Sequence, residues 1–217
     1  MTAKAPGAAR YLPQDRGLAS LETAAGRCRG CSLFEDATQT VFGRGHPRAA
    51  LMLVGEQPGD QEDRAGEPFV GPAGRLLARA LGDAAIDSEA VYETNAVKHF
   101  KFTRKAGKRR IHQKPGRTEV VACRPWLLAE IEAVGPQVIL CLGATAAQSL
   151  LGAAFRVSEQ RGQELRLPSS VDLDLTPEPT VMATVHPSSI LRDRGDQHEQ
   201  AYRQFVADLR KARSVLA

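Results

Sequence analysis

The stretch Ala49-Ala-Leu-Met-Leu-Val54, which runs directly into Gly55-Glu-Gln-Pro-Gly-Asp60, decides the fold class. A short apolar run that ends in Gly and Pro predicts a buried strand followed by a turn. Three more such runs follow at 91–97, 137–142 and 180–185. Helical patterns separate them, so we expect an α/β fold with a four-stranded parallel sheet that is covered on both faces.

Apolar residues at helical spacing predict helices around these strands. They lie at 18–27, 72–81, 118–134, 144–151 and 197–213. Residues 156–175 fit either a hairpin or an irregular loop. Residues 1–17 are rich in Ala, Pro and Gly and predict a loose N-terminal arm ahead of one domain over 18–217.

Composition excludes several protein classes. The 217 residues are 42% apolar and 25% charged, which is ordinary for a folded globular chain. The longest apolar stretch, Val138–Ala147, is too short to cross a bilayer. Met1–Arg10 lacks the apolar core of a secretory signal. We therefore expect a cytoplasmic protein with no membrane partner.

Positive charge is concentrated in one segment. Nine Lys or Arg and no acid lie between Lys98 and Arg117, while the rest of the chain has 20 basic and 25 acidic residues. A local cationic patch on an acidic body suits contact with a phosphate backbone. A solvated loop is the alternative, and composition alone favours it.

Polar side chains follow three of the predicted strands. Glu56, Asn95 and His186 each stand where a strand ends. The carboxyl ends of parallel strands form one edge of the sheet, where ligands bind. The structural alternatives are a turn residue for Glu56, a strand-end cap for Asn95 and a helix-start residue for His186. The convergence of all three residues on one edge of the sheet favours a ligand site.

Four cysteines in a chain without an export signal favour thiols or metal ligands over disulfides. Cys28 and Cys31 have a spacing that lets two thiolates reach one metal, whereas seventeen residues separate Cys123 from Cys141. Cys141 lies in an apolar strand, where a small buried residue is an equal alternative to a ligand.

Together these motifs resemble the uracil-DNA glycosylases of family 4, and specifically the UdgX type, which becomes covalently trapped on DNA. The resemblance runs from Cys28 to about Arg210. The resemblance rests on these motifs: Cys28 with Cys31, Gly55–Asp60, Glu67–Gly74, Thr94–Lys98, Lys108–His112, Cys123, Cys141 and His186–Ser189. The resemblance implies a three-layer α/β/α sandwich and a [4Fe–4S] cluster held by Cys28, Cys31, Cys123 and Cys141.

The resemblance also implies roles for the site residues. His186 would donate a hydrogen bond to O2 of uracil, where negative charge develops. Asn95 would bind the O4 and N3–H edge, and Phe69 would stack on the ring, beside Gly55 and the backbone near Gln57. Phosphate contacts would come from Lys108, Arg109, Arg110 and Ser188. The partners are then uracil-containing DNA, preferably single-stranded, and free uracil as the reaction product. We expect the protein to be a monomer.

Two features depart from ordinary family 4 members, which usually carry a small residue in place of Gln57 and lack the Lys108–His112 insert. In the UdgX type the histidine of this insert attacks the sugar. Here that residue would be His112, with Glu56 as its acid/base partner. One alternative is a conventional, multiple-turnover family 4 glycosylase. The other is a non-catalytic nucleic-acid-binding module with a structural metal site, in which zinc could replace iron.

Overall fold

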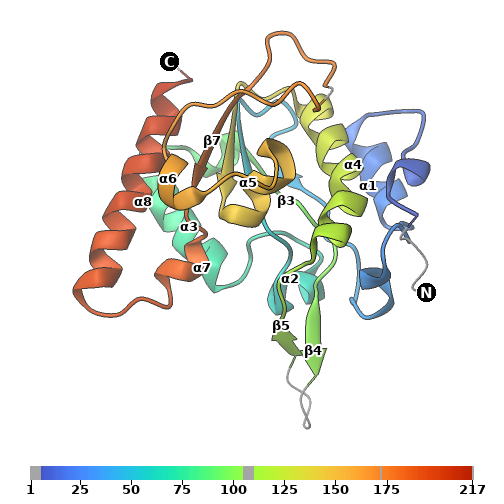
Figure 1. The fold of residues 1–217 in the computed structure, drawn as a ribbon, viewed down its shortest axis with the longest axis horizontal. Helices are drawn as coiled ribbons and strands as arrows, with labels where there is room; N and C mark the ends of the chain where they lie inside the picture. Colours follow the sequence, from blue (N-terminus) through green and yellow to red (C-terminus); the bar gives the residue numbers. More distant parts are fainter. Residues whose placement is uncertain (1–5, 105–109, 172, 217) are drawn as a thin grey trace.

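The computed structural model describes residues 6–104, 110–171 and 173–216 (Figure 1). Every predicted helix and strand is present, within about two residues of its expected bounds. The helices are α1 (Leu18–Ala25), α2 (Asp60–Ala65), α3 (Pro72–Asp83), α4 (Arg117–Val134), α5 (Ala144–Leu151), α6 (Val157–Gln160), α7 (Pro187–Ile190) and α8 (Asp196–Ser214). The strands are β1 (Arg44–Gly45), β2 (Leu51–Gly55), β3 (Val91–Asn95), β4 (Phe102–Arg104), β5 (Arg110–His112), β6 (Val138–Leu142) and β7 (Thr180–Thr184).

The central sheet has the strand order β1-β3-β2-β6-β7. Its four long strands are parallel, which confirms the predicted α/β sheet. A fifth strand, β1, pairs antiparallel with β3 at the edge. The sequence did not predict β1, because two residues are too few to show any periodicity.

Helices cover both faces of the sheet, as the three-layer expectation requires (Figure 1). Residues of β2, β6 and β7 alternate between the faces, and both sets are apolar. One set, including Met52 and Ile139, packs with α4 and α5. The other, including Leu53 and Leu140, packs with α3 and α8. This two-sided burial explains the continuous apolar runs in the sequence.

The prediction of a loose arm is wrong for the part of it that is described around Ala8. Ala8 is buried and donates a backbone hydrogen bond to Ala122 of α4, while Gly7 donates one to Gly30. The arm, α1 and the outer side of α4 enclose a third apolar cluster, which contains Cys28, Cys31 and Cys123. Burial of small side chains thus orders a segment whose composition is typical of a loop.

Strands β4 and β5 form a hairpin that projects from the body of the molecule (Figure 1). Three residue pairs join the strands, and Phe102 lies opposite His112. The ambiguous segment at 156–175 contains α6 and one isolated bridge, from Leu165 to Val181. Within the described chain, no helix combines the length and apolar character needed to cross a bilayer.

Candidate active site

A cavity of about 700 Å³ lies at the carboxyl ends of β2, β3 and β7. Six of the predicted site residues line it: Gln57, Phe69, Asn95, His112, His186 and Ser188. The strand ends thus bring together residues that are up to 131 positions apart in the sequence, between 57 and 188. This is the sheet edge at which a ligand site was expected.

Gly55 allows Asn95 and Phe69 to approach the end of β2 closely. A Cβ at position 55 would lie 2.3 Å from Oδ1 of Asn95 and 2.8 Å from Cζ of Phe69. Phe69 itself has a φ of 56°, a left-handed conformation that costs on the order of 1 kcal/mol in a non-glycine residue. Phe69 thus lines the cavity in a strained backbone conformation.

Asn95 lines the cavity and is free to bind a ligand through its amide. The residue is 3% exposed, and no hydrogen bond joins its side chain to another described residue. Its backbone carbonyl accepts a hydrogen bond from Nζ of Lys98 at 2.8 Å, and Lys98 forms a buried ion pair with Glu130. A fixed backbone with a free amide is what a site needs to recognise a nucleobase edge.

The hydrogen bonds of His186 define its tautomer. The backbone N–H of Ser188 donates to Nδ1 at 3.1 Å, so Nδ1 is unprotonated and Nε2 carries the proton. Burial, and then the nearby His112 charge, lower the pKa of His186 to about 4. At neutral pH, His186 is therefore an uncharged N–H donor. Ser188, predicted to contact DNA phosphate, also holds this ring, because its hydroxyl lies 2.8 Å from Nδ1.

Gln57 connects the cavity wall to the hairpin. Its Oε1 accepts from the backbone N–H of Lys101 at 3.2 Å, which fixes the orientation of the amide. Its Nε2 lies 3.0 Å from the carbonyl oxygen of Gln113 and 2.9 Å from Nε2 of His112. Because an amide nitrogen can only donate, Nε2 of His112 is the unprotonated acceptor, and its electron pair is engaged by Gln57. The Nδ1 atom then carries the proton.

Glu56 lies next to the same imidazole. Its Oε1 is 3.6 Å from Nε2 of His112, and its other oxygen accepts a hydrogen bond from the hydroxyl of Thr145 in α5. Sequence reasoning missed Thr145, because a Thr in the first turn of a helix looks like an ordinary capping residue. It also missed Leu191 and Arg192, which line the cavity just beyond the His186 motif.

The assignment of Arg110 as a phosphate contact needs correction. Its guanidinium pairs with Asp60 and Asp63 of α2, and its side chain is only 7% exposed. It also stacks over the rings of Phe100 and Phe102. Arg110 thus fastens the hairpin to the body of the protein, and its charge is neutralised. Lys108 and Arg109 lie outside the described residues.

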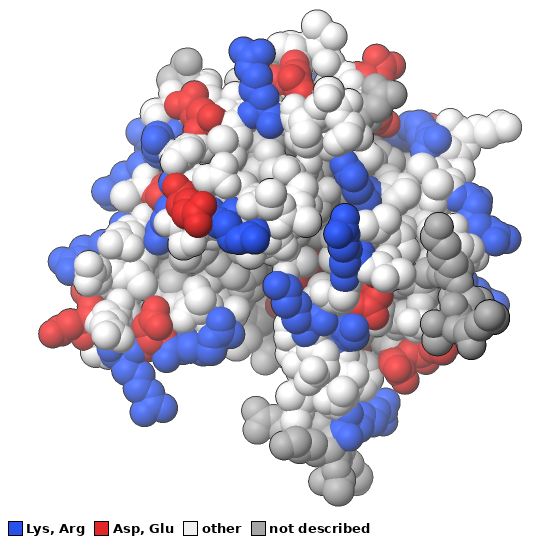
Figure 2. All heavy atoms as spheres, viewed as in Figure 1, with Lys and Arg blue, Asp and Glu red and all other residues white. Residues whose placement is uncertain are grey.

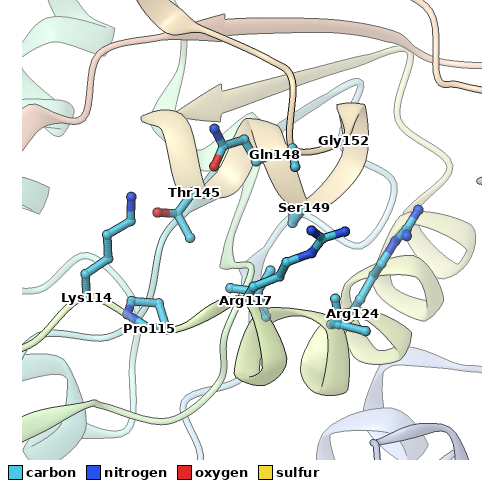
Figure 3. A pocket seen from close by; sticks show the side chains of 11 residues that line it. Lys114, Pro115, Arg117, Arg124, Thr145, Gln148, Ser149 and Gly152 are labelled. Atoms are coloured by element: carbon cyan, nitrogen blue, oxygen red, sulfur yellow. The ribbon is translucent and has the colours of Figure 1, made fainter.

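Two other cations of the predicted patch are also neutralised, since Lys98 pairs with Glu130 and Lys101 with Glu119. Of the other described cations of the patch, Arg104 lies on β4 of the hairpin, while Lys114 and Arg117 lie beside the active site. Figure 3 shows a second cavity, of about 290 Å³, between α4, α5 and the chain that follows the hairpin. Lys114, Arg117 and Arg124 line it, and so does Thr145, the partner of Glu56.

The described structure brings three of the four cysteines together. Cys28, Cys31 and Cys123 share one apolar cluster, and the pKa of Cys123 rises to about 12 through burial, despite the nearby Lys98 charge. The charges of Cys28 and Cys31 add to this rise, so the three thiols lie within electrostatic range. Backbone N–H groups donate to Sγ of Cys28 at 3.4 Å and of Cys123 at 3.3 Å. Such N–H···S bonds tune the sulfurs of iron–sulfur clusters.

Cys141 departs from the expected set. It packs in the cluster between α4 and the sheet, whereas Cys123 packs on the opposite side of α4. Burial alone raises the pKa of Cys141 to about 12. Among the described residues, no three His, Cys, Asp or Glu side chains converge closely enough to share one metal ion. A multinuclear group, whose ligands bind separate metal atoms, does not need such convergence, and the three thiols that share one apolar cluster fit it.

Comparison with known proteins agrees with this geometry. Residues 42–210 match the model of the uracil DNA glycosylase superfamily. The chain is 35% identical to the type-4 uracil-DNA glycosylase of Thermotoga maritima over 191 residues, which cover 88% of this chain and 90% of the relative. It is 34% identical to that of Pyrobaculum aerophilum, covering 76% and 80% of the two chains, and 42% identical to that of Archaeoglobus fulgidus, covering 56% and 57%. The chain therefore belongs to the uracil-DNA glycosylase superfamily, among its type-4 members.

Proposed function

We propose that the protein excises uracil from DNA as a repair enzyme. The observation that carries this proposal is the free amide of Asn95 in the cavity, beside Phe69 and opposite a neutral His186. Uracil offers an acceptor at O4 and a donor at N3, which complement the two halves of that amide. Cytosine offers the reverse pattern, so the same amide orientation rejects it.

Cleavage of the bond between C1′ and N1 leaves negative charge on the base and positive charge on the sugar. The Nε2–H of His186 would stabilise the charge at O2, and the Glu56 carboxylate would stabilise the cationic sugar. Removal of one such preorganised donor costs about 100- to 1,000-fold in rate in other enzymes. Neither role requires a proton to leave His186.

The DNA strand would run along the second cavity, where Lys114, Arg117 and Arg124 can meet phosphates. Figure 2 shows Lys and Arg side chains across the middle of this face, above the hairpin. Leu191 is 44% exposed at the mouth of the active-site cavity. An apolar side chain there can fill the space left in the base stack by a flipped nucleotide.

Excision is tested with single-stranded oligonucleotides that carry one uracil, thymine or cytosine. Uracil should be released, and thymine and cytosine should not. Asn95→Ala should reduce excision by about 100-fold while DNA affinity changes little, because the residue contacts a base edge and not the backbone. Equal loss of binding and excision would place Asn95 outside the base-recognition site.

A second candidate step is covalent capture of the DNA by His112. The favouring observation is the unprotonated Nε2 of His112, which lies 3.6 Å from Glu56 at the same cavity. When the hydrogen bond from Gln57 breaks, the electron pair of Nε2 would form a bond to C1′ as the C1′–N1 bond breaks and its electrons leave with uracil. The Glu56 carboxylate would balance the positive charge that the imidazole gains. Conventional turnover by water is the alternative, and the relatives are named type-4 uracil-DNA glycosylases without mention of a covalent step.

The two outcomes differ in a denaturing gel. Capture predicts a protein–DNA band that survives boiling in detergent, forms only with uracil-containing DNA and is absent with His112→Ala. Hydrolysis predicts no such band and more than one uracil per protein molecule. His112→Gly should convert the first behaviour into the second, because water can then reach C1′.

A [4Fe–4S] cluster is the cofactor that we propose for the cysteine site. The cluster would crosslink the N-terminal segment to α4 through Cys28, Cys31 and Cys123, and so stabilise the fold. No residue that lines the active-site cavity belongs to this cysteine cluster. Cys28→Ala should therefore lower stability before it changes the rate of excision. Stoichiometric zinc without iron in protein purified without air would refute the cluster.

A further inference from the structure

The proposed cluster needs a fourth ligand, because the structure places Cys141 in a different core from the other three cysteines. Cys141 is fully buried on the central strand β6, between Val54 and Ala183 of the neighbouring strands. No backbone N–H of a described residue donates to its sulfur. A small residue that fills the sheet core explains this position without a metal.

His99 lies where a fourth ligand is needed. It follows Lys98, whose backbone N–H donates to Sγ of Cys123. The residue is only 5% exposed, and it lines a cavity of about 590 Å³ together with Cys28. The imidazole thus shares a cavity with Cys28, and it stands one residue after the backbone N–H that contacts Cys123 of α4.

The hydrogen bonds of His99 determine which ring atom is available. Nε2 lies 2.9 Å from the hydroxyl oxygen of Thr40, and that hydroxyl donates its only proton to the carbonyl of Ala25 at 3.0 Å. Thr40 must therefore accept from Nε2–H, which leaves Nδ1 unprotonated. No described residue forms a hydrogen bond with Nδ1. An oriented ring with one N–H bonded to a neighbouring oxygen is the usual arrangement of a metal-binding histidine.

We infer that Nδ1 of His99 is the fourth protein ligand of the iron–sulfur cluster, with Cys28, Cys31 and Cys123, and that Cys141 is not a ligand. The inference rests on the cluster proposed above. Histidine replaces cysteine on iron in the Rieske centres, where the exchange raises the reduction potential. A neutral ligand in place of a thiolate makes the whole cluster less negative by one charge, so its potential should lie above that of a His99→Cys variant.

The test uses the full chain purified without air, with histidine labelled with nitrogen-15. Iron is measured per protein molecule, and pulsed electron paramagnetic resonance of the reduced cluster detects any nitrogen bound to iron. The proteins are wild type, His99→Cys, His99→Ala and Cys141→Ala. His46→Ala, which removes an exposed histidine, is the matched control.

Wild type, Cys141→Ala and His46→Ala should all hold a full complement of iron with a strong nitrogen coupling. His99→Cys should keep the iron, lose the coupling and have a lower potential. His99→Ala should lose most of its iron, and if it fails to fold, His99→Cys still decides the question. Iron without nitrogen coupling in wild type, or loss of iron in Cys141→Ala, would overturn the ligand assignment alone. Absence of iron from every protein would refute the cluster itself, and uracil release, measured separately, decides the excision activity.

Discussion

Gln57 donates a hydrogen bond from Nε2 to Nε2 of His112 at 2.9 Å. The same amide forms hydrogen bonds with the backbone of Lys101, just before β4, and of Gln113, just after β5. One side chain therefore fixes both the position of the hairpin and the tautomer of its histidine. This relationship gives a physical reason for a long amide directly after Glu56.

Gln57→Ala should slow covalent capture by about 10- to 100-fold, the effect of losing one to three kcal/mol of positioning hydrogen bonds. Excision should fall less, because Asn95 and His186 are unchanged. The measurement is the rate of appearance of the boiling-resistant band beside the rate of uracil release. Gln113→Ala is the control on the same hairpin, since its amide bonds only to Thr103 among the described residues. Equal rates for Gln57→Ala and wild type would show that the amide does not position His112.

Gly55→Ala should abolish excision without unfolding the protein. The added Cβ would overlap Oδ1 of Asn95 at 2.3 Å, so the amide must move out of its recognition position. Gly82→Ala is the matched control, because a Cβ there meets nothing within 4 Å and should stabilise α3 by about 0.5–1 kcal/mol. The measurements are uracil release and thermal unfolding. Wild-type activity in Gly55→Ala would contradict the proposed position of Asn95.

Acid should destabilise the wild type more than His186→Asn. Burial depresses the pKa of His186 to about 4, whereas an unfolded histidine titrates near 6.5. Between these values the unfolded state binds more protons, so the free energy of unfolding falls as pH drops from about 6.5 to about 4. The difference between the two proteins over this window should approach at most about 3 kcal/mol. Parallel pH profiles would mean that the folded protein does not hold His186 neutral.

Affinity for single-stranded DNA should weaken with salt through the second cavity. The double variant Lys114→Ala/Arg117→Ala should reduce the slope of log affinity against log salt by about 1.4, or about 0.7 for each lost phosphate contact. Arg203→Ala, which removes an exposed cation from α8, should leave the slope unchanged. The same slope in the double variant and wild type would place the DNA elsewhere.

The sheet and its covering helices could be predicted from the sequence because apolar periodicity is set by burial, and burial is continuous along β2, β6 and β7. The convergence of Glu56, Asn95 and His186 followed from the topology of a parallel sheet. Short elements such as β1 and α2 were not predicted, since the two residues of β1 show no alternation and the six residues of α2 form fewer than two helical turns.

Pairings between distant residues could not be predicted in the same way. Arg110 reads in the sequence as a free cation within a basic run, but α2 supplies two carboxylates that neutralise it. The sequence contains four cysteines, which suggests Cys141 as the fourth thiolate ligand, but Cys141 packs on the opposite side of α4 from the other three. His99 carries no metal-binding spacing in the sequence, and only its cavity and its bond to Thr40 single it out.

The most direct test of the central claim is the amount of free uracil released per protein molecule over time, measured by mass spectrometry with an excess of single-stranded DNA that contains uracil. We expect uracil to appear and to stop at one molecule per protein as His112 becomes bonded to C1′. Release that continues beyond this point would remove the covalent step and leave a conventional glycosylase. No release of uracil, from protein with intact iron and DNA affinity, would contradict the assignment of this cavity to uracil excision.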